Sequence, residues 1–133
     1  MPASPAQCRM WLIDRFEQTS TPYNMVGAYR LAGDLDLDLL AAAVDDVVTR
    51  HEALRTHFTE VDGELMQVVH PAHPLVWERL DASAFDADGQ ERALQELLRR
   101  ENQRRFDIAT GPVLHVATLR LSRDVVIFVM NVH

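Results

Sequence analysis

The residues of this chain that can do chemistry lie where predicted secondary-structure elements end. Val125 to His133 reads VVIFVMNVH, an apolar run that stops on a histidine. Histidine can act as a general base near neutral pH, because its ordinary pKa is about 6.5. Asn131 and His133 fall on one face of this predicted strand, since side chains alternate along a strand. Taken alone, one such histidine is equally compatible with a polar strand end that has no function.

A second group of ionisable residues runs from Arg50 to Thr56, where the sequence reads RHEALRT. Arg50 and His51 can compensate the dipole at the end of a predicted helix, and Glu52 and Arg55 can simply be solvated. The string Arg-His-Glu-x-Leu-Arg-Thr is nevertheless too specific to be explained by charge compensation alone.

Other candidate sites are weaker. His70 and His73 are flanked by prolines and have no third ligand at a suitable spacing, so no metal site is predicted. Asp86 to Gly89 contains two aspartates, but their spacing does not fit a calcium loop. Cys8 is the single cysteine, which excludes an internal disulfide and a thiolate metal cluster, and we expect it to pack rather than react.

Composition restricts the class of protein. The chain has 133 residues, of which 47% are hydrophobic and 25% charged, as in a soluble globular domain or part of one. The net charge of −7 argues against nucleic acid or an anionic membrane as a partner. Arginines between positions 92 and 105 alternate with glutamates and are interpreted as a solvated helix face. The start of the chain does not resemble a signal peptide, and Val125 to Met130 is too short to span a bilayer, so we expect a cytoplasmic protein.

Three helices are predicted to position these residues. The first starts at the N-cap Ser4, with Gln7 completing a capping box, and runs to about Glu17. The second runs from Asp36 to Leu54 and the third from about Asp88 to Phe106. The second helix has apolar residues on one face, namely Leu37, Leu40, Val44, Val47 and Leu54. Favourable i,i+4 ion pairs are expected in the third helix between Glu96 and Arg100 and between Glu101 and Arg105.

Several extended segments accompany the helices. They are Tyr23 to Leu31, Arg55 to Val61, Glu64 to His70, Leu75 to Leu80, Val113 to Leu121 and Val125 to Met130. Asp62-Gly63 predicts a two-residue hairpin turn. The last strand is apolar on both faces, which favours a central place in the sheet. The expected fold is an α+β sandwich.

These segments, in this order, resemble the condensation domains of nonribosomal peptide synthetases. Ser4 to Trp11 is similar to the first core motif of that family, and Arg50 to Phe58 to the second. Phe106 to Leu114 resembles the FDL…GPLLR stretch, although His115 stands where arginine is usual. In the family the last strand runs into an HHxxxDG motif, of which His133 would be the first histidine. The likeness covers the whole chain.

The resemblance implies a chloramphenicol acetyltransferase-like fold with two lobes and an active site in the tunnel between them. Residues 1–133 would be most of the N-terminal lobe, truncated at the first histidine of the motif. That histidine, His133, is mainly structural in the family, whereas the second histidine contacts the attacking amine and is absent from the chain. The aspartate of the motif is held by an arginine that corresponds to Arg55.

The resemblance also implies a reaction and its partners. Condensation domains form an amide between a peptidyl thioester and an aminoacyl amine, and the wording of the first motif is similar to domains that join two L-residues. No cofactor is bound directly; phosphopantetheine arms enter from upstream and downstream peptidyl carrier proteins, and adjacent synthetase domains are further partners. The 133 residues alone are expected to be inactive. Alternatives are an epimerisation domain, a carrier- or coenzyme A-dependent acyltransferase, and a non-catalytic lobe that docks a carrier protein.

Overall fold

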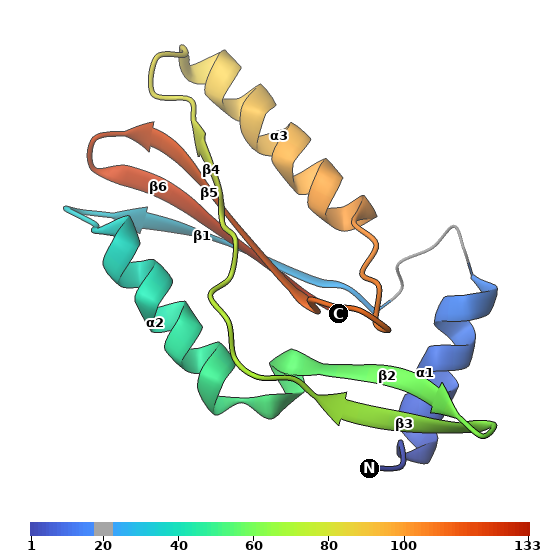
Figure 1. Cartoon of the computed structure of the whole chain (residues 1–133). Coiled ribbons are helices and arrows are strands. Elements are labelled where there is room, and N and C mark those ends of the chain that lie inside the picture. The colour runs from blue at the N-terminus through green and yellow to red at the C-terminus, as the bar shows by residue number, and fades with distance from the viewer. Residues whose placement is uncertain (18–22) are drawn as a thin grey trace.

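A computed structural model of the chain describes residues 1–17 and 23–133. The helices among these residues are α1 Pro5–Phe16, α2 Leu37–Arg50, the 3₁₀-helix η1 Glu52–Arg55 and α3 Ala87–Gln103. The strands are β1 Met25–Ala32, β2 Thr56–Val61, β3 Glu64–Val69, β4 Glu78–Asp81, β5 Leu114–Ser122 and β6 Val125–Val132. Figure 1 shows a four-stranded sheet between α2 and α3, with the β2–β3 hairpin and α1 together near the C-terminal end of β6.

The main sheet has the strand order β1-β6-β5-β4. β6 pairs antiparallel with both β1 and β5, while β4 pairs parallel with β5. The predicted central place of the last strand is therefore confirmed. Antiparallel pairing of β5 and β6 follows from the tight turn between them, which brings the start of β5 beside the end of β6.

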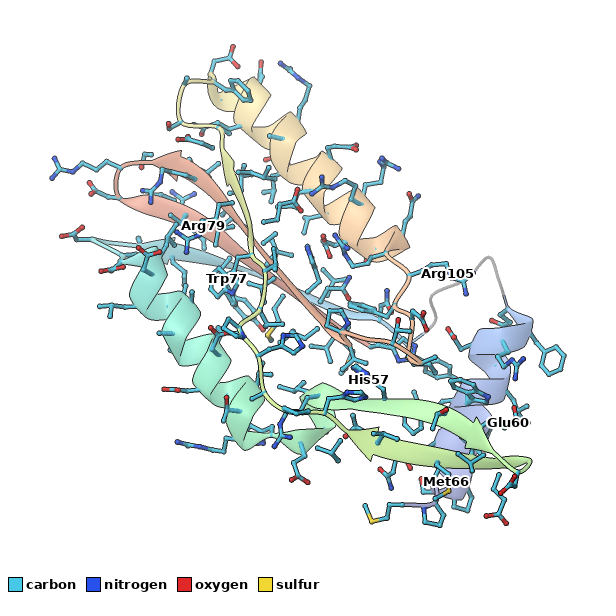
Figure 2. All side chains as sticks on the ribbon, viewed as in Figure 1. His57, Glu60, Met66, Trp77, Arg79 and Arg105 are labelled. Atoms are coloured by element: carbon cyan, nitrogen blue, oxygen red, sulfur yellow. The ribbon has the colours of Figure 1, made fainter. Side chains whose placement is uncertain are left out.

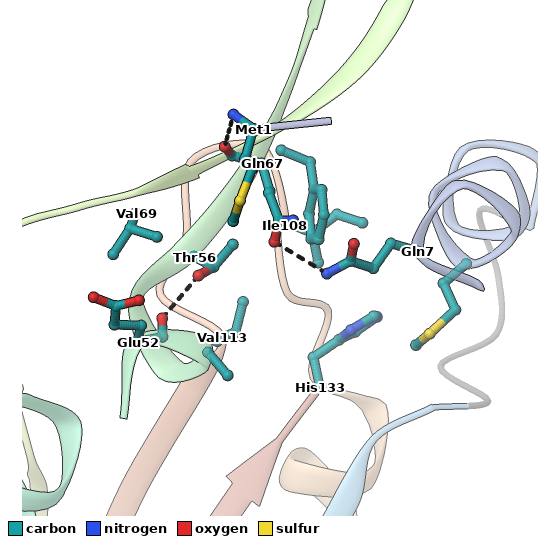
Figure 3. A pocket seen from close by; sticks show the side chains of 12 residues that line it. Met1, Gln7, Glu52, Thr56, Gln67, Val69, Ile108, Val113 and His133 are labelled. Carbon is teal, nitrogen blue, oxygen red and sulfur yellow. Dashed lines mark hydrogen bonds between the residues drawn. The ribbon is translucent and has the colours of Figure 1, made fainter. Parts of the chain in front are cut away.

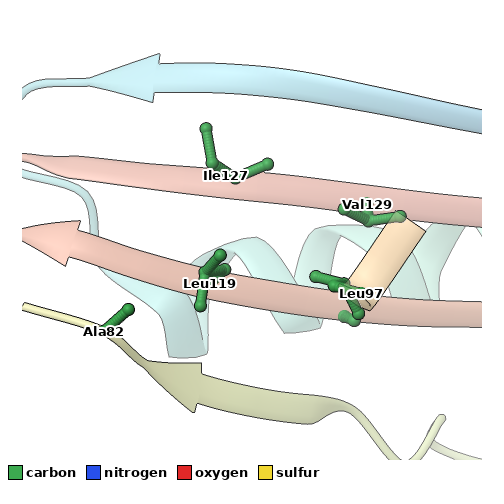
Figure 4. Close-up of a cluster of buried hydrophobic side chains, with 6 residues drawn as sticks. Ala82, Leu97, Leu119, Ile127 and Val129 are labelled. Carbon is green, nitrogen blue, oxygen red and sulfur yellow. The ribbon is translucent and has the colours of Figure 1, made fainter. Parts of the chain in front are cut away.

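Each face of the sheet packs against one helix. Towards α3, the core is a cluster of buried apolar residues, Ala82, Leu97, Ala117, Leu119, Ile127 and Val129 (Figure 4). Towards α2, Val48 packs with Leu114 and Val116. Because side chains alternate along β6, Asn131 and His133 lie on the same side as Ile127 and Val129, facing α3.

Local sequence signals account for most element ends. Ser4 and Gln7 form the predicted capping box of α1. Asp62 and Gly63 both have positive φ angles, 52° and 81°, which is the conformation of a two-residue type I′ hairpin turn. α3 starts earlier than expected, because Asp86 rather than Asp88 caps it and accepts a hydrogen bond from the Gly89 amide at 2.7 Å.

Several predictions of element ends and faces were wrong. The second helix stops at Arg50 and continues as η1, since the His51 backbone is extended. Its buried residue is Val48, whereas Val47 is 48% exposed. β1 starts at Met25, so Tyr23 precedes it, and β4 starts only at Glu78.

The predicted i,i+4 ion pairs of α3 are also replaced by other contacts. Arg100 reaches out of the helix to Glu78 of β4 at 2.7 Å, and Arg105 lies 4.0 Å from Asp14 of α1. Figure 2 shows Arg105 beyond the end of α3, on the side of α1. Tertiary partners thus outcompete neighbours on the same helix, because pairs on a helix surface contribute only about 0.2–0.5 kcal/mol.

Candidate active site

His133 directly follows β6 and is held by both backbone and ring contacts. Its amide donates a hydrogen bond to the Val113 carbonyl at 3.0 Å. Its ring centroid lies 6.2 Å from that of Phe106, edge to face, and 6.4 Å from that of Tyr23. Burial lowers the pKa of His133, and the Asp14 carboxylate opposes this shift only in part. The imidazole is therefore neutral near pH 7, the form that can accept a proton.

His133 lines a cavity of about 380 Å³ (Figure 3). Its apolar wall consists of Met1, Met10, Ala53, Phe58, Val69, Ile108 and Val113, and its polar groups are Gln7, Glu52, Thr56, Gln67 and His133. A volume of this size falls in the range of small-molecule sites, which are mostly apolar with a few polar groups. Figure 3 shows the polar side chains approaching from different parts of the chain.

The polar groups of this cavity are fixed by local structure. Gln7 uses its Oε1 to accept from the Ser4 amide at 2.7 Å, and its Nε2 donates to Gln67 Oε1 at 3.3 Å. The Thr56 hydroxyl donates to the Glu52 carbonyl at 2.8 Å, across η1. The capping box and the 3₁₀ turn thus set the directions of these side chains.

Arg55 lies on the other side of η1 from this cavity. Its Nη1 donates to the His70 carbonyl at 2.8 Å and its Nη2 to the Thr49 carbonyl at 3.2 Å. The side chain is only 18% exposed, and its buried Nε has no hydrogen-bond partner among the described residues. Arg55 and His133 therefore line different cavities, although Glu52 and Thr56 beside Arg55 reach the cavity of His133.

The cavity that Arg55 lines measures about 20 Å³, room for about one water molecule. His57, His70 and His73 line it as well. The rings of His57 and His70 stack with centroids 4.2 Å apart. Burial, followed by repulsion from His70 and His73, lowers the pKa of His57.

Sequence reasoning missed Glu101, which has no exposed surface and lies at the centre of a polar network. Arg104 donates to both carboxylate oxygens at 3.0 Å. His115 Nδ1 lies 3.1 Å from the same carboxylate, as does Asn131 Nδ2. Burial raises the pKa of Glu101, but the hydrogen bonds from Arg104 and Asn131 outweigh it and hold the pKa below its usual value. The one available signal was His115, which stands where the family resemblance makes arginine usual.

Glu78, Glu101 and His115 also present ligand atoms within 4.8 Å of one another, the spacing of a metal site. Each carboxylate, however, already has an arginine: Arg100 contacts both oxygens of Glu78 at 2.7 Å, and Arg104 contacts both of Glu101. A divalent cation would have to displace or approach these two positive charges. The donor set therefore fits charge-paired structural carboxylates better than a metal.

None of the described helices combines the length and apolar character needed to cross a lipid bilayer. Cys8 is partly buried, and its Sγ lies 3.9 Å from the Ala3 carbonyl, as expected for a packed side chain.

The comparisons with known proteins agree with this fold and these segments. Residues 1–133 match the family model of the condensation domain. A linear gramicidin synthase of Brevibacillus parabrevis is 37% identical over 133 residues, which are 100% of this chain and 3% of that protein. Isonitrile lipopeptide synthase of Mycobacterium tuberculosis is 41% identical over 135 residues, covering 100% of this chain and 5% of that protein.

Among solved structures, a mutant starter condensation domain of rhizomide synthetase in complex with C8-CoA superposes with a TM-score of 0.84 at 25% identity. The match covers 98% of this chain and 29% of that one. The predicted fold class, an α+β sandwich of the chloramphenicol acetyltransferase-like kind, is thereby confirmed. The chain belongs to the condensation-domain family of nonribosomal peptide synthetases.

Proposed function

We propose that this chain is the N-terminal lobe of a condensation domain that forms a peptide bond between a peptidyl donor and an aminoacyl acceptor. One observation carries the proposal: three segments far apart in the sequence meet at one cavity. Gln7 comes from the first motif-like segment, Glu52 and Thr56 from the second, and His133 from the end of β6. These are the segments whose wording resembles the condensation core motifs.

In the proposed reaction the acceptor amine attacks the carbonyl carbon of the donor thioester. The new C–N bond replaces the C–S bond, the donor arm leaves as a thiol, and the amine's proton is transferred in the process. A second histidine directly after His133 would contact the amine, either to orient it or to take up the proton. His133 itself has the structural role, supported by its packing between Phe106 and Tyr23.

Arg55 is proposed to hold the aspartate of the same motif. Its buried Nε has no hydrogen-bond partner among residues 1–17 and 23–133, so it remains available for a further acceptor. An ion pair at this position would fix the loop that carries the second histidine, and such preorganisation lowers the barrier of the reaction. The residues that follow His133 in the parent protein test this first, and His-x3-Asp-Gly is the expected sequence.

The proposed substrates reach the site as thioesters on phosphopantetheine arms of upstream and downstream carrier proteins, and the donor is proposed to be L-configured. A second candidate is the transfer of an acyl group, as in a starter condensation domain. The apolar wall of the 380 Å³ cavity and the superposition on a domain solved with C8-CoA favour it. The two candidates differ only in the donor.

The test uses the full synthetase protein that contains this chain, with carriers loaded with an aminoacyl donor, an acyl donor and an aminoacyl acceptor. Mass spectrometry of the acceptor carrier should detect a dipeptidyl thioester. An N-acyl aminoacyl thioester alone would favour the second candidate, and an epimerised donor without coupling would favour an epimerisation domain. Carrier binding without any product would indicate a docking lobe. The 133 residues alone should give no product above the carrier-only background.

A further inference from the structure

The buried network around Glu101 lies at the end of the sheet that holds His133. Glu101 is in the last turn of α3, and Arg104 follows as its C-cap residue. Asn131 Nδ2 donates both to the Glu101 backbone carbonyl at 2.7 Å and to its carboxylate at 3.1 Å. Asn131 pairs with His115 across β5 and β6, so both donors to Glu101 come from one rung of the sheet. The end of α3 is thus joined by directional polar contacts to the two central strands.

Asn131 stands two residues before His133 on the same face of β6. The amide of His133 is in turn bonded to Val113, directly before β5. Movement of this end of β6 would therefore move the His133 backbone and the start of whatever follows it. Glu101 restrains that movement from the α3 side, because Asn131 is completely buried and has no room for another rotamer.

We propose that Glu101 and Asn131 are positioning residues for the active site, which fix the end of β6 and hence His133 and the residue after it. The consequence for catalysis rests on the proposed function, whereas the consequence for His133 itself does not. Glu101 and Asn131 touch no reacting atom and act only through the strand.

Two observations separate this role from simple packing. First, Asn131 Oδ1 is buried without a hydrogen-bond partner among the described residues, which costs stability. A strand under selection for stability alone would be better served by valine at this position, since its neighbours in β6 are mostly apolar. Second, the buried apolar cluster around Leu97 already attaches α3 to the sheet without any polar contact.

The structure offers a matched control at the other end of the same helix. Gln90 Nε2 donates to the Leu121 carbonyl at 2.7 Å and to the Ala82 carbonyl at 3.2 Å, so it also joins α3 to the sheet. Leu121 lies seven residues along β5 from Leu114, which pairs with the end of β6. At roughly 3.3 Å per residue, the two attachments are about 20 Å apart.

The experiment compares Asn131→Val, Glu101→Gln and Gln90→Ala in the full synthetase protein, with melting temperature measured for each. Asn131→Val should keep the fold and lower the single-turnover condensation rate about 10- to 100-fold, as expected for a small misplacement of catalytic groups. Gln90→Ala should lower the melting temperature by a similar amount or more and leave the rate unchanged. Equal rate losses at equal stability losses in the two variants would overturn the proposal.

A second measurement does not depend on activity. Ring-labelled histidine NMR of the same proteins should show the His133 resonances shifted in Asn131→Val and Glu101→Gln, with a ring pKa closer to about 6.5, its ordinary value. The resonances should be unchanged in Gln90→Ala. If the wild type forms no peptide bond with any donor, the proposed function is wrong, but the NMR comparison still decides whether Glu101 and Asn131 position His133. Unshifted His133 resonances in both network variants would contradict it, and Glu101→Gln provides that answer should Asn131→Val fail to fold.

Discussion

Three histidines in the described part of this chain have pKa values lowered by burial. They are His57, His115 and His133, and for each of them desolvation is the largest cause. For His115 the Glu101 carboxylate works in the opposite direction, but Arg104 and burial outweigh it. Neutral imidazoles are therefore part of the folded state, and each must be protonated at a cost when the pH falls.

The sign of the resulting pH dependence follows from linkage. Since the folded pKa values lie below the unfolded value of 6.5, the unfolded chain binds more protons as the pH falls below 6.5. Stability is complete above that pH and is lost as the pH falls towards about 5. His115→Gln, which can still donate to Glu101, should reduce this loss. The check is the melting temperature of wild type and variant at about pH 7.5 and about pH 5.5, on either side of that window.

The control for this experiment is His51→Gln, because His51 is exposed and caps α2 only through its backbone. The pH-dependent difference should stay as in the wild type. A domain of this size loses about 4 °C in melting temperature per kcal/mol, so small changes are measurable. An identical pH response of His115→Gln and wild type would show that the imidazole of His115 does not contribute.

Arg55 supports a second prediction at the residue scale. It joins the end of α2 to the end of β3 through the carbonyls of Thr49 and His70. Arg55→Ala in the full synthetase protein should lower both stability and condensation rate, since losing one partner of a buried pair costs roughly 3–5 kcal/mol. Arg55→Lys keeps the charge but not the fork of donors and should recover only part of the loss. Unchanged melting temperature and rate in Arg55→Ala would mean that another arginine holds the motif's aspartate.

The connection from α3 to β5 depends on a glycine. Gly111 has a φ angle of 64°, and a Cβ at this position would clash with the ring of His57. Gly111→Ala should therefore destabilise the chain by more than the roughly 1–2 kcal/mol of a left-handed alanine. Gly63→Ala is the matched control, because Gly63 also has a positive φ angle but no neighbour near its Cβ position. Denaturant unfolding should give a larger loss for Gly111→Ala, and equal losses would rule out a steric contribution from His57.

Elements with strong local signals could be predicted from the sequence, and their partners could not. The capping box at Ser4, the Asp62-Gly63 hairpin and the central place of β6 follow from residue patterns within a few positions. Whether Arg100 pairs with Glu96 or with Glu78 depends on where β4 lies, and a parallel pairing of β4 with β5 leaves no local signal. Long-range contacts decided these cases.

The same limit applies to the candidate site. His133 and the segment around Glu52 could be found because family motifs mark them, and the structure brings them to one cavity. Glu101 could not be found, because a glutamate among arginines in a helix reads as a solvated pair until burial is known. Its importance arises only when β5 and β6 bring His115 and Asn131 to it.

At the scale of the whole molecule, the sheet has one long edge strand. β1 is paired with β6 on one side, and its other edge has no strand partner among the described residues. Met25 and Tyr29 of β1 are 69% and 54% exposed. The apolar run of β6, by contrast, is paired on both sides and largely buried. An unpaired, largely uncharged edge is a template for pairing with a second chain, so β1 is the greater aggregation hazard.

We therefore expect the isolated 133 residues to self-associate through β1, and the remainder of a full domain to reduce this. Ala28 is exposed in the middle of β1, and Ala28→Lys places a charge on the edge, which blocks strand addition. Val76→Lys adds the same charge at a residue that is 91% exposed but outside every strand. Light scattering across a concentration series should show association for wild type and Val76→Lys and a monomer for Ala28→Lys. A wild type that stays monodisperse at high concentration would mean that this edge is protected by its own twist and by Arg30, and equal rescue by both lysines would assign the effect to net charge instead of the strand edge.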